Sequence, residues 1–194
     1  MRIVGGRLRG RLLNAPASRA IRPTSERLRE SIFDILAHRY PSSLDGARVV
    51  DLFAGSGALG IEALSRGADF ALFVDDGAEA RALLRGNIAE LGLGGVTRIW
   101  RADATKLGKA PAGAPFTLAF LDPPYLKGLA APALAALKVG GWLAADAFCV
   151  VEEASKLELA APAGYEVLDQ RTYGDAQIML LQVSASAVGA PRTA

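Results

Sequence analysis

The sequence predicts an α/β protein whose mostly parallel sheet ends in an antiparallel hairpin. From Gly46 onward, apolar strand-like runs alternate with helix-like segments at a regular spacing. A glycine-rich turn, residues 54–60, follows the first of these runs. Near the end of the chain only residues 172–175 separate two strand-like segments. Four residues are too few for a crossover helix, so these two strands must be antiparallel neighbours.

Each predicted strand is an apolar run bounded by glycine, proline or acidic residues. The seven predicted strands span residues 48–53, 70–74, 96–100, 116–121, a part of 143–151, 165–171 and 176–183. Between them, helices with apolar residues at helical spacing are predicted at residues 58–66, 78–91 and 129–137. This alternation is typical of an open sheet with helices on both faces.

The composition is that of an ordinary globular domain. Of the 194 residues, 51% are hydrophobic and 22% are charged, and no apolar run reaches the roughly 18 residues that a membrane span requires. The chain starts without the apolar stretch of a secretion signal. Cys149 is the single cysteine, which excludes an internal disulfide and predicts a buried strand position. We therefore expect a cytoplasmic monomer with no membrane partner.

Basic charge is concentrated at the start of the chain. Residues 1–40 contain nine arginines and three acidic residues, a net charge of +6, whereas the remainder has a net charge of −4. Within this basic part, Thr24 or Ser25 is predicted to be the N-cap of a helix whose apolar stripe includes Leu28 and Ile32.

Residues 2–13 predict a short hairpin with a Gly-Gly turn. Alternation on the return strand would place Leu8 and Leu12 on one face and the arginines on the other, namely Arg7, Arg9 and Arg11. Because the guanidinium group suits forked contacts to phosphate, the arginine face could follow a nucleic-acid backbone. It could equally be a solvated edge kept soluble by its charge.

Acidic residues follow four of the predicted strands, at the edge where ligands of open α/β sheets bind. They are Asp51, Asp75 with Asp76, Asp103, and Asp122. Each of them alone could be an ordinary helix-capping residue. The turn that follows Asp51 has the spacing Gly55-x-Gly57-x-x-Gly60, which fits a dinucleotide as well as S-adenosylmethionine (SAM).

SAM would use all of these groups. Backbone N–H groups of residues 55–57 would bind its carboxylate, and the charge of Asp51 would favour its ammonium group. Asp75 would accept hydrogen bonds from both ribose hydroxyls, and Asp103 from the adenine amino group. NAD would gain nothing from Asp51 beside its pyrophosphate, so SAM is the favoured cofactor. The predicted cofactor site comprises Asp51, Phe53, Ala54, Gly55, Ser56, Gly57, Asp75, Asp76, Asp103 and Ala104.

The fourth predicted strand runs into Asp122-Pro123-Pro124-Tyr125, the (Asp/Asn)-Pro-Pro-(Tyr/Phe) motif of methyltransferases that modify exocyclic amino groups of bases. With this motif, the chain from residue 1 to about 183 resembles the RsmD family. The resemblance also rests on Met1-Arg2-Ile3-Val4-Gly5-Gly6, Arg22-Pro23-Thr24-x-x-x-Leu28-Arg29-Glu30-x-Ile32-Phe33 and the stretch 51–63. One departure is Asp75, where relatives often have Glu.

The resemblance implies a Rossmann-like class I SAM-dependent methyltransferase that methylates N2 of a guanine in 16S rRNA, alone or in the small ribosomal subunit. The Asp122 carboxylate and the Pro123 carbonyl would accept hydrogen bonds from the guanine amino group, Pro124 would fix the turn, and Tyr125 would stack on the base. The RNA would be held by Arg7, Arg9, Arg11, Arg22 and Thr24. No metal is expected.

The resemblance and the charge pattern together predict three parts. Residues 1–40 would form an RNA-contacting extension, residues 41–183 the methyltransferase domain, and residues 184–194 a disordered tail. Two other functions remain open. One is methylation of another exocyclic amino group, such as adenine N6, and the other is an NAD-dependent oxidoreductase.

Overall fold

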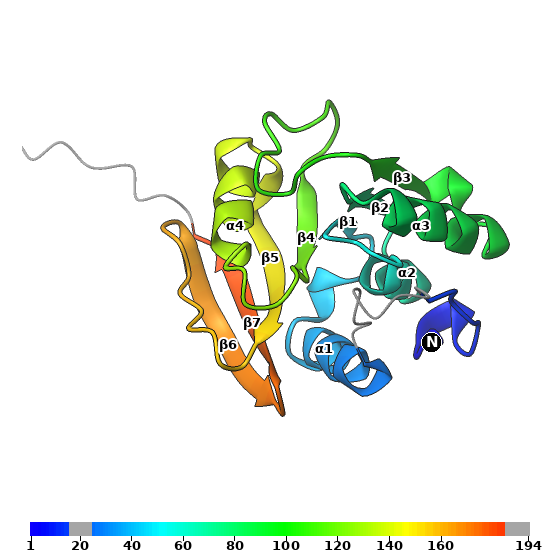
Figure 1. Cartoon of the computed structure of the whole chain (residues 1–194), viewed down its shortest axis with the longest axis horizontal. Helices are drawn as coiled ribbons and strands as arrows, with labels where there is room; N and C mark the ends of the chain where they lie inside the picture. The colour runs from blue at the N-terminus through cyan, green and yellow to red at the C-terminus, as the bar shows by residue number, and fades with distance from the viewer. Residues whose placement is uncertain (16–24, 185–194) are drawn as a thin grey trace, which may run out of the picture.

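A seven-stranded sheet forms the centre of the molecule (Figure 1). The structure, a computed structural model, describes residues 1–15 and 25–184. The strand order is β3-β2-β1-β4-β5-β7-β6. The strands are β1 (Arg48–Leu52), β2 (Phe70–Val74), β3 (Thr97–Trp100), β4 (Phe116–Leu121), β5 (Leu143–Ala154), β6 (Tyr165–Tyr173) and β7 (Ala176–Val183). The predicted seven-stranded α/β sheet is confirmed.

The direction of the strands also follows the prediction. β1 pairs in parallel with both β2 and β4, and β4 pairs in parallel with β5. β7 runs antiparallel to β5 and to β6, which makes the closing hairpin. β5 and β6 continue beyond the predicted ends, since their register with β7 extends to Ala154 and Tyr173. The strand order switches between β1 and β4, because β2 and β3 extend the sheet on one side of β1 and the later strands extend it on the other.

Alternate strand residues face two layers of helices. Val49 packs in the cluster that includes residues of α1 (Glu26–Arg39), α2 (Ala58–Ser65) and α3 (Ala78–Glu90). Val50 packs in a second cluster with residues of α4 (Ala130–Val139). Cys149 belongs to this second cluster and is fully buried, as predicted, and burial raises the pKa of its thiol. None of the described helices is both long and apolar enough to cross a membrane.

Residues 1–3 pair antiparallel with residues 10–13, as a hairpin would, but the turn between them is not the predicted Gly-Gly turn. A 3-10 turn, Gly6–Leu8, lies where the return strand was expected, and a single antiparallel bridge joins Arg2 to Leu12. Leu8 is buried against the core, but the Leu12 side chain is 68% exposed and Leu13 is buried in its place. The strict alternation was wrong because the chain turns through helical backbone at residues 6–8, which changes the facing of every later side chain.

α1 begins at the N-cap Ser25, whose side chain accepts a hydrogen bond from the N–H of Leu28. The alternative N-cap, Thr24, lies outside the described residues, as does the tail beyond residue 184. Besides the expected apolar stripe, α1 buries the guanidinium group of Arg29 completely. A buried cation requires a nearby anion, and the anion here comes from α2.

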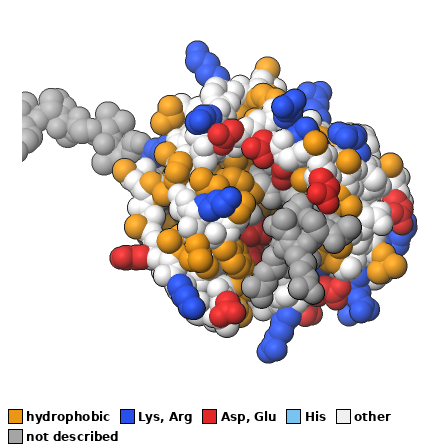
Figure 2. Space-filling view, viewed as in Figure 1, with side chains coloured by type: hydrophobic (Ala, Val, Ile, Leu, Met, Phe, Trp, Pro, Cys, Tyr) orange, Lys and Arg blue, Asp and Glu red, His pale blue; other side chains and the backbone are white. Residues whose placement is uncertain are grey.

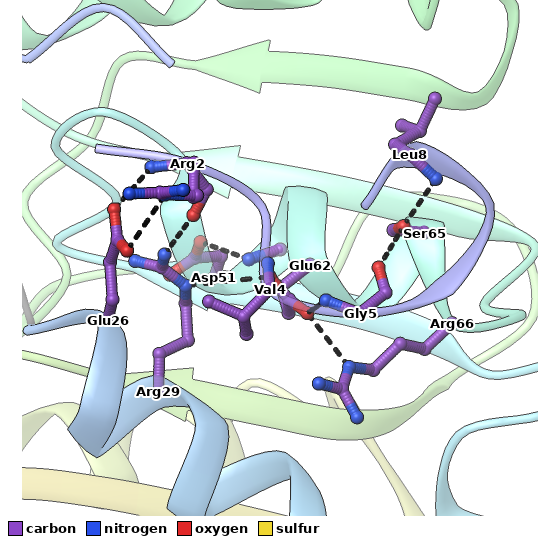
Figure 3. Close-up of polar contacts among 11 residues, drawn as sticks. Arg2, Val4, Gly5, Leu8, Glu26, Arg29, Asp51, Glu62, Ser65 and Arg66 are labelled. Atoms are coloured by element: carbon purple, nitrogen blue, oxygen red, sulfur yellow. Dashed lines mark hydrogen bonds and ion pairs between the residues drawn. The ribbon is translucent and has the colours of Figure 1, made fainter. Parts of the chain in front are cut away.

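Glu62 of α2 is that anion, and it also holds the start of the chain (Figure 3). Its carboxylate accepts hydrogen bonds from the N–H groups of Val4 (2.9 Å) and Gly5 (2.7 Å). It lies 3.5 Å from Nε of Arg29 and 2.8 Å from Nε of Arg66. The start of the chain, at Val4 and Gly5, is therefore held on the helix that follows β1, and the division at residue 40 stays a prediction.

Candidate active site

A cavity of about 860 Å³ opens at the carboxyl ends of β1, β2, β3 and β4, where the strand order reverses. This is the position at which open α/β sheets bind ligands, and the volume is in the range of cofactor pockets. Acidic side chains from all four strand ends line it, namely Asp51, Asp75, Asp76, Asp103 and Asp122, and Glu79 adds a sixth. Basic and acidic side chains are interspersed on the face of the molecule drawn in Figure 2.

The turn after β1 is tightly constrained. Phe53 has a φ of 58°, which is unfavourable for a non-glycine residue. Residues with strained backbone of this kind are found most often at functional sites. The Gly55 N–H donates to Oδ2 of Asp75 (2.9 Å), and the Gly57 N–H donates to the carbonyl of Ala54 (2.7 Å). Two of the three N–H groups expected to bind the SAM carboxylate therefore have partners within the protein.

Gly57 and Gly60 serve packing and helix initiation. Gly57 does not line the cavity but precedes α2 with a φ of 80°, and a Cβ there would lie 2.3 Å from Cδ1 of Leu84. A Cβ on Gly60 would lie 2.4 Å from the ring of Phe73. The first residues of α2, Ala58 and Leu59, do line the cavity, and the opening N–H groups of a helix lack intrahelical partners. The start of α2 is thus the better site for a carboxylate.

Asp51 is almost fully buried, and its Oδ2 accepts a hydrogen bond from the Gly60 N–H at 2.9 Å. Burial raises the pKa of Asp51 to about 8, with the nearby Asp75 contributing in the same direction. Burial therefore shifts Asp51 toward the neutral carboxylic acid. This shift acts against the expected charge on Asp51, and its cause is the depth at which β1 holds the side chain.

Asp75 bridges two loops, because its Oδ1 accepts from the Gly77 N–H (2.8 Å) while its Oδ2 accepts from Gly55. A carboxylate has about four acceptor positions, so these bonds leave room for two hydroxyl donors. Asp76 is exposed at the rim. Asp103 accepts from the backbone and hydroxyl of Thr105, and these hydrogen bonds hold the pKa of Asp103 below its usual value.

The Asp122-Pro123-Pro124-Tyr125 segment forms the wall of the cavity that follows β4. Pro123 is buried and Pro124 is exposed, so the segment passes from the interior to the surface between these two residues. The Tyr125 hydroxyl donates to Oε1 of Glu152, a buried residue of β5, at 2.6 Å. This bond fixes the orientation of the tyrosine ring at the cavity.

The structure brings together all but one of the residues predicted for the cofactor and for catalysis, the exception being Gly57. Arg7, Arg9 and Arg11 are exposed, and Nη2 of Arg11 donates to the carbonyl of Glu90. Arg22 and Thr24 lie outside the described residues.

Sequence reasoning missed several cavity residues, notably Glu79, Thr105, Lys127 and Leu129. Only Lys127 had a local signal, its position two residues after the motif. No group of three or more His, Cys, Asp or Glu side chains in the described parts is arranged to hold a metal.

Comparison with known proteins places the chain in one family. Residues 1–182 match the family model described as Conserved hypothetical protein 95. Ribosomal RNA small subunit methyltransferase D of Escherichia coli strain K12 is 38% identical over 187 residues, which cover 95% of this chain and 91% of that protein. The protein of the same name from Haemophilus influenzae is 32% identical over 184 residues, covering 94% and 93%.

Solved structures give the same result. The yhhF protein of Escherichia coli is 33% identical and covers 95% of this chain and 98% of its own, with a TM-score of 0.81. The rRNA methyltransferase aviRa from Streptomyces viridochromogenes, at 17% identity, has a TM-score of 0.69 over 86% of this chain and 88% of its own and shows a shared fold alone. The match over residues 1–182, together with the identity to these relatives, shows that the chain belongs to the RsmD family of methyltransferases.

Proposed function

We propose that this protein transfers a methyl group from SAM to the exocyclic N2 of a guanine in the 16S rRNA of the small ribosomal subunit. The observation that carries the proposal is the shared cavity, in which Asp122-Pro123-Pro124-Tyr125 faces the acids at the ends of β1, β2 and β3. The names of the relatives from Escherichia coli and Haemophilus influenzae support the same class of substrate.

The residues of the cavity fit SAM. Asp75 keeps acceptor positions for the ribose hydroxyls, and Asp103 offers a second carboxylate beyond it. The first N–H groups of α2 would bind the carboxylate, and Asp51 lies below them. A bound SAM would supply an electrophilic methyl group on its sulfonium. The ammonium group would stabilise the charged form of Asp51 and lower the pKa of this residue.

The amino group of guanine is a weak nucleophile because its lone pair is conjugated with the ring. Hydrogen bonds from its two N–H groups to the Asp122 carboxylate and the Pro123 carbonyl would turn the lone pair toward the methyl group and stabilise the positive charge that develops. Tyr125, held by Glu152, would stack on the base after it leaves its helix or loop. As the methyl group leaves the SAM sulfonium for the nitrogen, the Asp122 carboxylate would accept the proton that the nitrogen loses.

All the described residues of the cavity come from one chain, which supports the expected monomer. An rRNA substrate also implies that the protein acts in the cytoplasm. Adenine N6 is the runner-up target, because the same motif would orient any exocyclic amino group. An NAD-dependent oxidoreductase is less favoured, since buried Asp51 beside the turn gives no advantage to a pyrophosphate.

Transfer of labelled methyl from SAM to small subunits of a strain lacking its own RsmD-family enzyme tests the proposal. We expect one labelled nucleotide, identified as N2-methylguanosine after digestion, and loss of the label with Asp122→Ala. Asp122→Asn keeps one acceptor oxygen and should retain partial activity. Label on adenine would establish the runner-up target, whereas calorimetric binding of NAD(H) without binding of SAM would overturn the proposal.

A further inference from the structure

The cavity contains a marked charge imbalance. Five carboxyl side chains besides the buried Asp51 line it, and among the described residues that form its wall Lys127 is the one basic side chain. A nucleotide that enters this cavity brings its phosphates to the rim, where the acids would repel them. An RNA-binding cavity of this composition therefore needs a cation near the position of the target base.

The backbone around Lys127 is held in an unusual conformation. Leu126 has a φ of 63°, and with Phe53 it is one of two described non-glycine residues with a positive φ. Its side chain is 62% exposed, so packing of that side chain does not explain the strained backbone. The Leu126 N–H donates to Oε1 of Glu153 at 2.9 Å, and Glu153 is fully buried in β5.

The start of the turn is thus anchored twice, to adjacent residues of β5. Tyr125 is bound through its hydroxyl to Glu152, and Leu126 through its N–H to Glu153. Gly128, with a φ of 63°, completes the turn on the other side of Lys127. Strained backbone persists only where surrounding contacts impose it. Here the contact between Leu126 and Glu153 accompanies the strain, and the next residue, Lys127, lies on the cavity wall.

We propose that Lys127 binds a phosphodiester group next to the target nucleotide, so that the base enters beside Asp122 while its backbone stays at the rim. This inference rests on the proposed function. The carboxylate of SAM is a second anion that a lysine could bind. The phosphodiester is favoured because the cofactor groups lie after β1, β2 and β3, whereas Lys127 is in the β4–α4 loop with the base-binding motif.

Binding of 16S rRNA and of SAM to Lys127→Ala tests the inference, with Lys127→Arg as the charge-preserving variant. Lys109→Ala is the matched control, since this lysine is exposed and lies outside the cavity. The N–H of the next residue, Ala110, donates to the carbonyl of Gly140, which precedes β5. We expect Lys127→Ala to weaken RNA binding about threefold to tenfold and to lower the slope of log affinity against log salt by about 0.7–1. SAM affinity should remain within about twofold.

The outcomes separate this inference from the proposed function. Equal RNA affinity and salt slope for Lys127→Ala and Lys109→Ala would overturn the role of Lys127, even if the wild type methylates guanine. Loss of SAM affinity with unchanged RNA binding would also overturn it and assign the lysine to the cofactor carboxylate. Absence of methyl transfer by the wild type would instead refute the proposed function, because the binding titrations do not depend on turnover. Recovery of RNA affinity and slope in Lys127→Arg would support the phosphate contact.

Discussion

Nδ2 of Asn87 donates a hydrogen bond to the backbone carbonyl of Ser56 at 2.9 Å, which ties α3 to the turn that begins the cofactor site. The same amide also bonds to the backbone of Asn14, with its oxygen accepting from the Asn14 N–H at 2.8 Å. Asn87 is 1% exposed. One buried side chain therefore connects the end of the first described segment, the turn after β1 and the helix after β2.

Asn87→Ala should lower the free energy of unfolding by about 1–3 kcal/mol, because it leaves the polar backbone groups of Ser56 and Asn14 without this partner. SAM binding should also weaken, since the turn is less well held. Urea unfolding and calorimetry measure the two effects. The matched control is Asn14→Ala, which keeps the backbone contacts and removes a contact with Glu90. Equal stabilities of the two variants would contradict the prediction.

Glu62→Gln should destabilise the protein by about 3–5 kcal/mol, because the buried Arg29 would lose its counter-charge. The N–H groups of Val4 and Gly5 should exchange with solvent faster, since they donate to this carboxylate. Hydrogen exchange with denaturant unfolding checks both effects. The exposed pair of Arg2 and Glu26 offers a control, for which Glu26→Gln should cost less than about 1 kcal/mol. Unchanged exchange at Val4 and Gly5 would show that Glu62 does not hold this segment.

Two glycine-to-alanine substitutions should change the free energy of unfolding in opposite directions. Gly60→Ala in α2 should destabilise by about 1–3 kcal/mol, because the new methyl group would lie 2.4 Å from the Phe73 ring. Gly86→Ala in α3 should stabilise by up to about 1 kcal/mol, because a Cβ there meets nothing within 4 Å and alanine favours a helix. Thermal and urea unfolding measure both. Stabilisation by Gly60→Ala would mean that α2 does not pack this closely on β2.

Asp51 should make stability depend on pH. Its pKa in the folded protein, about 8, is above the ordinary value of 3.8, so the folded state binds the proton more tightly. The resulting stability is fully present below about pH 4 and is lost as the pH rises through 8, at up to about 1.4 kcal/mol per pH unit. Asp51→Asn should lack this slope. Parallel unfolding profiles of the two proteins between pH 5 and 9 would show that Asp51 is charged in the free protein.

The exposed arginines of the first segment are predicted to contact RNA. Charge reversal at Arg7, Arg9 and Arg11 should weaken binding to small subunits and reduce its salt dependence, because each contact to a phosphate releases a counterion. Filter binding at several salt concentrations measures both quantities. Reversal at Arg98, an exposed residue of β3, serves as the control. If affinity and slope stay unchanged, these arginines are a solvated edge.

Much of the fold could be predicted because its signals are local. Each strand is a short apolar run, and the two-residue link from Tyr173 to Ala176 leaves an antiparallel hairpin as the only connection. The acids at the strand ends could be predicted to meet, since parallel strands end at one edge. The first segment was predicted less well, because the 3-10 turn at Gly6–Leu8 depends on contacts with α2, such as the Leu8 N–H to Ser65.

The sequence by itself determined the sheet, the motif after β4 and the set of acids around one cavity, because periodicity and short motifs act over a few residues. Only the tertiary structure decided that burial raises the pKa of Asp51, that Asn87 holds Ser56, and that Glu153 binds the N–H of Leu126 beside Lys127. These properties arise from burial and from hydrogen bonds between residues that are far apart in the sequence. Such contacts leave no pattern in the sequence. A polar residue in a helix or strand could face solvent or be buried, and only the packing of the folded chain decides which.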